Sequence, residues 1–262
     1  MKEFEESDII DCLKYVISDV DDTITKGSKL YPSALQSLYD AKDAGLEIIL
    51  VTGGSAGWAD AYIRQWPVDA VIAESGAVLL ARENGKIRYF ENPILSDGSF
   101  REKRRKLMSS TGALPFSSDQ YARLYDVAYE VDSLTDEERE YLLSELDKLG
   151  FPYLESSIHI NVLMGEYDKG GAVRDFMPEL VRLGVVDEDE SFSTLTRKAI
   201  AFGDSLNDSS LFAFFPYSIG NMNVYRKRDF FSCLPAFFVR KEGGDAFGTA
   251  LGMITNHYKV VK

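Results

Sequence analysis

The segment that most constrains this chain is YVISDVDDT at residues 15–23, a short apolar run followed by closely spaced aspartates. Residues 15–18 predict a buried strand, and Asp19 and Asp21 come just after its end. Because ligands of open α/β sheets bind outside the carboxyl ends of the strands, we expect both carboxylates at a ligand site. Two neighbouring carboxylates repel each other unless a cation or a proton offsets their charge. The segment therefore indicates a hard metal ion, although aspartates after a strand also cap turns or helices.

Strands and helices alternate regularly in the first third of the chain. Residues 32–44 carry apolar side chains at three- and four-residue spacing, which predicts a helix with one buried face. Apolar runs predict strands at residues 46–51 and 70–73, with a helix at residues 57–66 between them. Strand, helix and strand at this spacing are typical of a parallel sheet with right-handed crossovers.

The regular alternation stops near residue 83. Residues 121–131 alternate in a way that predicts a strand, although tyrosines at every fourth position there also fit a helix. Residues 135–149 predict an amphipathic helix that begins with a capping box. We therefore expect an inserted α+β domain at residues 83–166 within a parallel α/β core. The core is expected to comprise residues 1–82 and 167–262.

The first pattern returns after the insert. A helix is expected at residues 171–183, and an apolar strand at residues 198–202 leads into the acidic segment GDSLND at residues 203–208. Further strands are expected at residues 217–219 and 236–239, and a last helix at residues 244–254.

Polar residues that suit phosphoryl transfer lie at strand ends or helix starts of this predicted core. Asp204 and Asp208 are four residues apart, so on a first helical turn they face the same way. With Asp19 they can form a Mg²⁺ site, since Mg²⁺ takes one or two carboxylates plus phosphate oxygens. Thr52 with the Gly53 amide can hold phosphoryl oxygens.

A carboxylate nucleophile can form an aspartyl-phosphate, and this splits one difficult step into two. Asp21 can then protonate the leaving alcohol and later activate water, while Lys169 supplies a fixed positive charge. Each motif also has a purely structural explanation. The segment TGG could be a common turn, Lys169 a surface residue, and GDSLND a helix cap with acidic residues in the first turn. The occurrence of all of them in order on these elements favours the chemical interpretation.

The ordered motifs resemble those of the haloacid dehalogenase superfamily: DVDDT at residues 19–23, TGG at 52–54, KG at 169–170 and GDSLND at 203–208. The position of the insert resembles the cap arrangement of the Cof-like subclass IIB. The resemblance implies a Rossmann-like parallel sheet core with an inserted α+β cap domain.

The resemblance also implies a role for each motif residue. Asp19 would be the nucleophile and Asp21 the general acid and base, with Lys169 as the third catalytic residue. Mg²⁺ would be held by Asp19, Asp204, Asp208 and the carbonyl of Asp21. The phosphoryl group would be bound by Thr52 and Lys169, with Gly53, Gly54 and Asn207 as further contacts of the substrate. Two positions depart from the family pattern, since Asp22 replaces a common Gly and Ser75 a common Asn; we expect Asp22 to face away from the phosphate.

The expected function is a Mg²⁺-dependent phosphatase that hydrolyses a small phosphomonoester, such as a phosphosugar, through an aspartyl-phosphate. A phosphomutase of the phosphomannomutase kind, using the same chemistry, is the alternative. A phosphate-accepting signalling module is a remote alternative, because such a module needs no large insert over its site.

Composition limits the partners. The net charge of −13 argues against nucleic acid, which binds basic surfaces, so we expect a small phosphorylated metabolite as the partner. No apolar run approaches the roughly 20 residues that span a bilayer, so no membrane association is expected. Cys12 and Cys233 make no disulfide framework, and the amino-terminal residues lack a secretory apolar region. These features predict a reduced, cytoplasmic protein.

Residues of the insert are candidates for reading the substrate. A basic run at residues 101–106 could meet an anionic substrate or form a solvated helix face. His159 and Asn161 share one face of a predicted strand and could bind sugar hydroxyls. Trp58 and Trp66 lie on a predicted core helix and are expected to pack.

Overall fold

The structure is a computed structural model and describes residues 1–156 and 158–261. Its centre is a nine-stranded sheet in which the pairs from β1 to β6 are parallel and β7 and β8 are antiparallel at one edge. This confirms the predicted Rossmann-like α/β core. In spatial order the strands are β1 (Lys2–Glu3), β14 (Phe237–Phe238), β13 (Ser218–Gly220), β12 (Ala199–Gly203), β2 (Tyr15–Ser18), β5 (Glu47–Val51), β6 (Ala70–Ala73), β7 (Val78–Glu83) and β8 (Lys86–Glu91).

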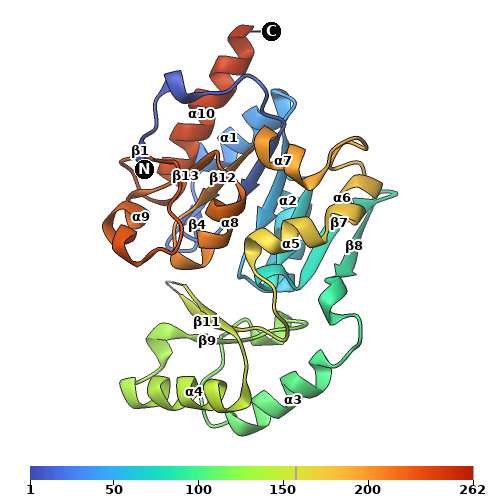
Figure 1. Cartoon of the computed structure of the whole chain (residues 1–262), viewed down its shortest axis with the longest axis vertical. Helices are drawn as coiled ribbons and strands as arrows, with labels where there is room; N and C mark the ends of the chain where they lie inside the picture. The colour runs from blue at the N-terminus through green and yellow to red at the C-terminus, as the bar shows by residue number, and fades with distance from the viewer. Residues whose placement is uncertain (157, 262) are drawn as a thin grey trace.

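Helices cover both faces of this sheet (Figure 1). Central strands such as β2 are buried on both sides, which explains their unbroken apolar sequence. Across the described part of the chain, no helix combines the length and apolar composition of a membrane span. One face carries α1 (Pro32–Asp43), α2 (Ala56–Gln65) and α10 (Gly243–Val261), and the other α5 (Lys169–Asp175), α6 (Met177–Arg182), α7 (Phe192–Lys198) and α8 (Ser209–Phe214).

A second, three-stranded antiparallel sheet lies between the large sheet and two helices at the far end of the molecule (Figure 1). Its strands are β10 (Tyr153–Glu155), β11 (His159–Val162) and β9 (Val127–Glu130), and its helices are α3 (Phe100–Ser110) and α4 (Asp136–Leu149). Val127, Tyr129, Ile160 and Val162 pack toward the helices. Because side chains alternate along a strand, Glu130, His159 and Asn161 lie on the opposite face, toward the large sheet.

Several sequence predictions differ from the observed elements. The strand expected at residues 121–131 is only β9, and a 3-10 turn occupies Gln120–Ala122. The helix expected at residues 171–183 is two helices, α5 and α6, with Pro178 in the first turn of α6. Elements not predicted are α7, α9 (Met222–Lys227), β1 and the hairpin of β3 (Thr25–Lys26) with β4 (Lys29–Leu30).

The start of the insert also differs from the expected position near residue 83. Strand β8 follows that position but pairs with β7 in the large sheet. Residues up to Glu91 therefore belong to the core sheet, because they continue its hydrogen-bonded ladder. We name residues 92–166 the cap segment.

A buried carboxylate joins the cap segment to the core. Glu74 follows β6 and is fully buried. Its Oε1 accepts hydrogen bonds from the backbone N–H of Leu124 (2.8 Å) and Ala56 (3.1 Å). Its Oε2 accepts from the N–H groups of Tyr125 (2.8 Å) and Asp126 (3.0 Å). One core side chain thus satisfies three successive amides of the cap segment.

A buried arginine of the cap segment makes a second link to the core. The guanidinium of Arg123 pairs with Asp119 (3.0 Å) and Asp126 (2.9 Å), and it donates to the carbonyl oxygen of Gly53 (3.0 Å). Its side chain has no exposed surface, so its charge depends on these partners. The loop before β9 is therefore fixed against the segment that follows β5.

We expect Glu74→Ala to lower the free energy of unfolding by about 3 kcal/mol, because it leaves the buried amides of residues 124–126 without an acceptor. Chemical denaturation monitored by circular dichroism measures this. Glu188→Ala, which removes an exposed carboxylate, should change the value by less than about 0.5 kcal/mol. Equal effects of the two substitutions would contradict the assigned role of Glu74.

Candidate active site

A buried lysine lies between two aspartates at the carboxyl end of the large sheet. Asp19 follows β2, and its backbone N–H donates to the carbonyl oxygen of Phe202 in β12 (3.0 Å). The Nζ atom of Lys169 lies 2.7 Å from Oδ1 of Asp19 and 2.7 Å from Oδ1 of Asp208. All three charged side chains are at least nine-tenths buried, so each depends on the others for compensation.

The start of α5 fixes the position of Lys169. Asp168 caps this helix, because its Oδ1 accepts from the N–H of Gly171 (2.7 Å). A Cβ atom at Gly170 would lie 2.4 Å from the carbonyl oxygen of Ser210, so glycine allows α5 to pack closely on α8. This contact brings Lys169 beside the loop that carries Asp208.

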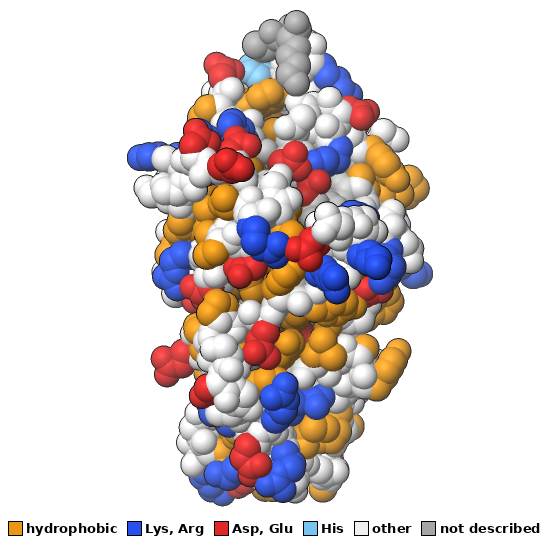
Figure 2. Space-filling model, turned by 90° about the vertical axis from the view of Figure 1, so that its right-hand side faces the viewer, with side chains coloured by type: hydrophobic (Ala, Val, Ile, Leu, Met, Phe, Trp, Pro, Cys, Tyr) orange, Lys and Arg blue, Asp and Glu red, His pale blue; other side chains and the backbone are white. Residues whose placement is uncertain are grey.

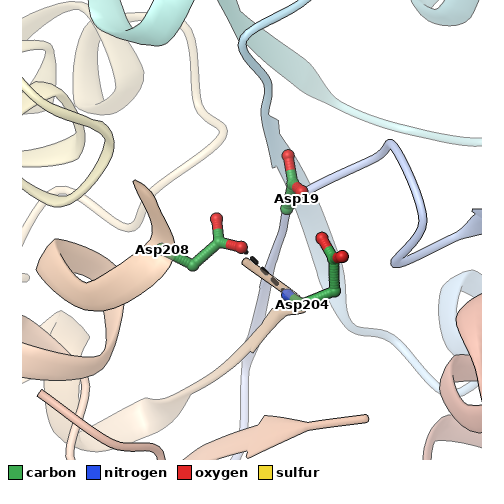
Figure 3. Close-up of side chains that lie close together, drawn as sticks. All are labelled: Asp19, Asp204 and Asp208. Atoms are coloured by element: carbon green, nitrogen blue, oxygen red, sulfur yellow. Dashed lines mark hydrogen bonds between the residues drawn. The ribbon is translucent and has the colours of Figure 1, made fainter. Parts of the chain in front are cut away.

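The loop after β12 folds around the carboxylate of Asp208. Its Oδ2 accepts from the N–H groups of Asp204 (2.9 Å) and Ser205 (3.0 Å), and Figure 3 shows the first of these bonds. A Cβ atom at Gly203 would lie 2.6 Å from Cβ of Asp208, which explains the glycine at this point. These contacts turn the carboxylate of Asp204 toward Asp19.

The acidic side chains Asp19, Asp204 and Asp208 fit a divalent cation. Each offers an oxygen atom within 4.8 Å of the others, and all three are buried (Figure 3). Both oxygens of Asp208 accept short hydrogen bonds from the protein (2.7 and 2.9 Å), whereas those that Asp204 accepts are longer (3.3 and 3.4 Å), so Asp208 is better suited to orient its neighbours. Asp19 and Asp204 are the better direct ligands, because carboxylate oxygens suit hard cations.

The electrostatics of these groups favour a bound cation. Burial and then the charge of Asp208 raise the pKa of Asp204 to about 7, and the same two causes raise the pKa of Asp19 well above its ordinary value. Burial alone would lower the pKa of the Lys169 ammonium. The attraction of the Asp19 and Asp208 carboxylates is stronger than this effect, so the pKa is raised. The cluster therefore holds more negative charge than Lys169 alone compensates.

Asp21 lies at the junction of two spaces. A narrow pocket is lined by Asp21 together with Asp19, Lys169 and Asp204. Asp21 also lines a wider cavity of about 400 Å³ beside α2. Burial raises the pKa of the Asp21 carboxyl, with Lys169 acting in the opposite direction. A carboxyl group in this position can exchange a proton with a molecule that extends from the pocket into the cavity.

The predicted phosphate-binding residues lie around the same pocket. Gly53 and Asn207 line the narrow pocket, and Gly54 lines the wider cavity. Thr52 is fully buried at the end of β5, and its Oγ1 accepts from the N–H of Gly54 (2.9 Å). The expected residues are thus brought together by three strand ends and the start of α5.

The cap segment contributes residues to this pocket. Ser156, His159 and Asn161 line it opposite the aspartates. The Nδ2 atom of Asn161 donates to the carbonyl oxygen of Gly53 (3.3 Å), and a Cβ atom at Gly53 would lie 2.6 Å from it. The shared face of His159 and Asn161, visible in the alternation of the sequence, is confirmed.

Sequence reasoning missed a second layer around Asp204. Asn223 donates to Oδ2 of Asp204 (3.4 Å) from α9, a helix that was not predicted. Thr23 donates to the other carboxylate oxygen (3.3 Å). Asp22 accepts from the N–H of Gly27 (3.0 Å) and lines neither space, in agreement with the expectation that it faces away.

The basic run of residues 101–106 lies elsewhere. Arg101, Arg104 and Arg105 line a separate cavity of about 640 Å³ with aromatic residues of the cap segment. None of the described residues that line this cavity also lines the pocket of Asp19. Figure 2 shows Lys and Arg side chains gathered at the lower end of the molecule. The structure thus favours the solvated-face interpretation of this run.

Comparisons with known proteins point to a hydrolase family. Residues 16–99 match the family model described as haloacid dehalogenase-like hydrolase. The phosphoglycolate phosphatases of Pyrobaculum aerophilum and Pyrobaculum neutrophilum are 32% and 30% identical to this chain over 164 residues. The matched part is 62% of this chain and 67% of each relative.

Solved structures share the fold at low identity. The crystal structure of protein 0175 of Thermoplasma acidophilum has a TM-score of 0.69 and 18% identity, over 95% of this chain and 99% of that chain. The sucrose-phosphatase of Synechocystis has a TM-score of 0.63 and 17% identity, over 94% of this chain and 98% of that chain. Both cover the cap segment as well as the core.

We expect Mg²⁺ to raise the melting temperature more at pH 8 than at pH 5. Since the pKa of Asp204 is about 7 in the folded protein against an ordinary 3.8, the unfolded chain releases this proton first as the pH rises. The metal-free protein therefore loses stability between these values, and a cation on the ionised carboxylates offsets the loss. Thermal unfolding with MgCl₂ or with EDTA at both pH values tests this. Equal shifts at the two pH values would contradict it.

Proposed function

Because this chain belongs to the haloacid dehalogenase-like hydrolases, we propose that it is a phosphatase that hydrolyses a small phosphomonoester with Mg²⁺. The observation that carries the proposal is the buried cluster of Lys169 with Asp19, Asp204 and Asp208 beside Asp21. This cluster would combine a nucleophile, a cation site and a fixed positive charge at the ends of β2 and β12 and the start of α5. The two relatives named phosphoglycolate phosphatase support the same reaction class.

Asp19 is the proposed nucleophile. The Lys169 ammonium, 2.7 Å from its Oδ1, favours the ionised carboxylate against the effect of burial. Attack by Asp19 on phosphorus forms an aspartyl-phosphate and breaks the bond between phosphorus and the ester oxygen. Water then hydrolyses this intermediate, which releases phosphate and restores the carboxylate.

Asp21 is the proposed general acid and base. Burial raises the pKa of this carboxyl group, which favours the protonated form that can donate to the leaving alcohol. After the alcohol leaves, the same carboxylate accepts a proton from the attacking water. The position of Asp21 between the narrow pocket and the wider cavity supports both transfers.

Thr52, Gly53, Gly54 and Asn207 are the proposed contacts of the phosphoryl oxygens. The Thr52 hydroxyl oxygen accepts from the N–H of Gly54, so its own hydrogen remains available for donation. The Asn207 Oδ1 accepts from the Ser205 hydroxyl (2.8 Å), which leaves the amide N–H₂ as a donor. Such preorganised donors stabilise charge that develops on the phosphoryl group.

Asp19, Asp204 and the backbone carbonyl of Asp21 are the proposed holders of Mg²⁺, with Asp208 supporting them. When bound, Mg²⁺ neutralises phosphate charge so that a carboxylate can approach.

The cap segment is proposed as a cap domain over the site. Its residues Ser156, His159 and Asn161 line the pocket that contains Asp19, which supports a role in excluding water during the reaction.

We expect Asp19→Asn to lower phosphatase kcat at least about a thousandfold, because an amide is a poor nucleophile in this position. Release of p-nitrophenol from p-nitrophenyl phosphate, with Mg²⁺ and with EDTA, measures the activity. Asp229→Asn, which alters a carboxylate that is 83% exposed, is the control and should retain wild-type activity. Full activity of a folded Asp19→Asn protein would overturn the mechanism.

A further inference from the structure

The basic run that the proposed reaction does not use lines a cavity of its own on the cap segment. This cavity has a volume of about 640 Å³ and lies between α3 and the residues just before β9. We name it the arginine groove after Arg101, Arg104 and Arg105, which line it from α3. Figure 2 shows Lys and Arg side chains beside hydrophobic ones at the end of the molecule that α3 occupies in Figure 1. The volume lies within the range of sites for small organic ligands.

The arginine groove is positively charged, although the chain as a whole has a net charge of −13. The described residues that line it include three arginines and no aspartate or glutamate. Glu102 pairs with Arg105 at 2.6 Å, but both side chains are largely exposed, so solvent screens this pair. Guanidinium groups bind phosphate through paired hydrogen bonds, so the groove suits a phosphorylated anion.

The spacing of the three arginines favours charges that lie close together in the ligand. Arg101, Arg104 and Arg105 come from about one turn of α3 and share one face of the helix. A chain of phosphates carries its charges over a similarly short length, whereas the carboxylates of an acidic peptide are spread along a backbone. The charge distribution therefore favours a polyphosphate over an acidic peptide.

The groove also has apolar walls. Leu124 is 48% exposed, and Met108 lines the groove from the next turns of α3. The rings of Phe100 and Tyr125 pack together with centroids 4.9 Å apart, and the guanidinium of Arg101 lies 4.8 Å from the centroid of the Phe100 ring. Exposed apolar side chains beside arginines give a ligand ring a surface to pack on. The ligand is therefore expected to combine phosphates with an apolar ring.

We propose that the arginine groove binds a nucleoside polyphosphate as an effector of the enzyme. The phosphates pair with Arg101, Arg104 and Arg105, and the base packs on Leu124 and Met108. An uncharged nucleoside would leave the arginines without an anion, and a bare polyphosphate would leave the apolar wall in contact with water. This site is separate from the pocket of Asp19, so its ligand is not the substrate.

Hydrogen bonds join the arginine groove to the active site. The guanidinium of Arg104 donates to the carbonyl oxygens of Arg123 (3.2 Å) and Asp126 (3.4 Å). Arg123 in turn donates to the carbonyl oxygen of Gly53, which lines the pocket of Asp19. A phosphate competes for Arg104, because a charged acceptor binds a guanidinium more strongly than a neutral carbonyl does. Binding in the groove therefore weakens the hold on residues 123–126, and we expect it to lower the activity.

Calorimetric titration of the full chain with AMP-PNP, adenosine, tripolyphosphate and hexaglutamate tests the binding. The protein is first freed of metal ions by dialysis, so that no metal draws phosphate into the pocket of Asp19. We expect AMP-PNP to bind at least tenfold more tightly than each of the other three compounds. No binding of AMP-PNP up to about 1 mM would overturn the proposal. Equal or tighter binding of tripolyphosphate or hexaglutamate would overturn the assignment of a nucleoside polyphosphate.

Substitution of two arginines locates the site. Arg101→Ala combined with Arg104→Ala should weaken AMP-PNP binding at least tenfold, because it removes two partners of the phosphates. Arg197→Ala combined with Lys227→Ala removes the same charge at exposed positions on the core and should leave the affinity unchanged. Wild-type affinity in the folded groove variant overturns the proposal. If that variant does not fold, Arg101→Glu should weaken binding at least tenfold, and an unchanged affinity overturns the proposal.

Tryptophan fluorescence reports the coupling without any use of phosphatase activity. Trp58 is 54% exposed, so the expectation that it packs is wrong. It follows Gly57 on α2, where a Cβ atom would lie 2.7 Å from Cβ of Ala122 in the loop before β9. A displacement of this loop by AMP-PNP should change the emission of the wild-type protein but not that of Trp58→Phe. Identical wild-type emission with and without saturating AMP-PNP overturns the coupling.

The effect on the reaction separates this proposal from the proposed function. Saturating AMP-PNP should lower kcat/KM for p-nitrophenyl phosphate at least threefold in the wild-type protein and leave it unchanged in Arg101→Glu. An equal decrease in both proteins would show competition at the active site and overturn the coupling. Absence of phosphatase activity would overturn the proposed function alone, because the calorimetric and fluorescence measurements do not depend on it.

Discussion

The buried ion pairs of Lys169 with Asp19 and Asp208 are the interaction on which the rest of the site depends. They join the end of β2, the start of α5 and the loop after β12, which are far apart in the sequence. Removing one partner from such a group leaves an uncompensated buried charge, which commonly costs about 3–5 kcal/mol. The charged groups proposed for the reaction are thus also needed for a stable fold. Gly170 and Gly203 allow the close packing of α5 and of the loop after β12 that keeps these groups together.

The segment after β5 couples this centre to the cap segment. The carbonyl oxygen of Gly53 accepts hydrogen bonds from the side chains of Arg123 and Asn161. The carboxylate of Glu74 accepts hydrogen bonds from the backbone N–H groups of residues 124–126, which follow Arg123. A movement of the cap segment must therefore disturb the backbone that borders the pocket of Asp19. Binding of a substrate that contacts both parts can be transmitted through these hydrogen bonds.

The sequence predicted those parts of the molecule that follow from local pattern. Buried parallel strands such as residues 15–18 and 70–73 carry unbroken apolar runs, so their bounds were predicted correctly. The loop before β9 was predicted as a strand from its alternating sequence. Its observed conformation is set instead by Glu74, which is far from the loop in the sequence, and by the ion pairs of Arg123 within the loop. Asp19 and Lys169 were recognisable from their motifs. The position of Trp58 and Tyr62 in the wall of the cavity beside α2 was not, because the cap-segment residues that line the same cavity lie far from them in the sequence.

The alternation of side chains in β9 and β11 separates two requirements on the cap segment. Val127, Tyr129 and Ile160 pack against α3 and α4, whereas Glu130 and His159 face the cavity from the same strands. Substitutions on the cavity face leave the hydrophobic packing behind the sheet untouched. Single substitutions on the cavity face can therefore change the chemistry of the cavity with little penalty in folding stability, so the lining of the cavity and the packing of the cap segment can vary independently.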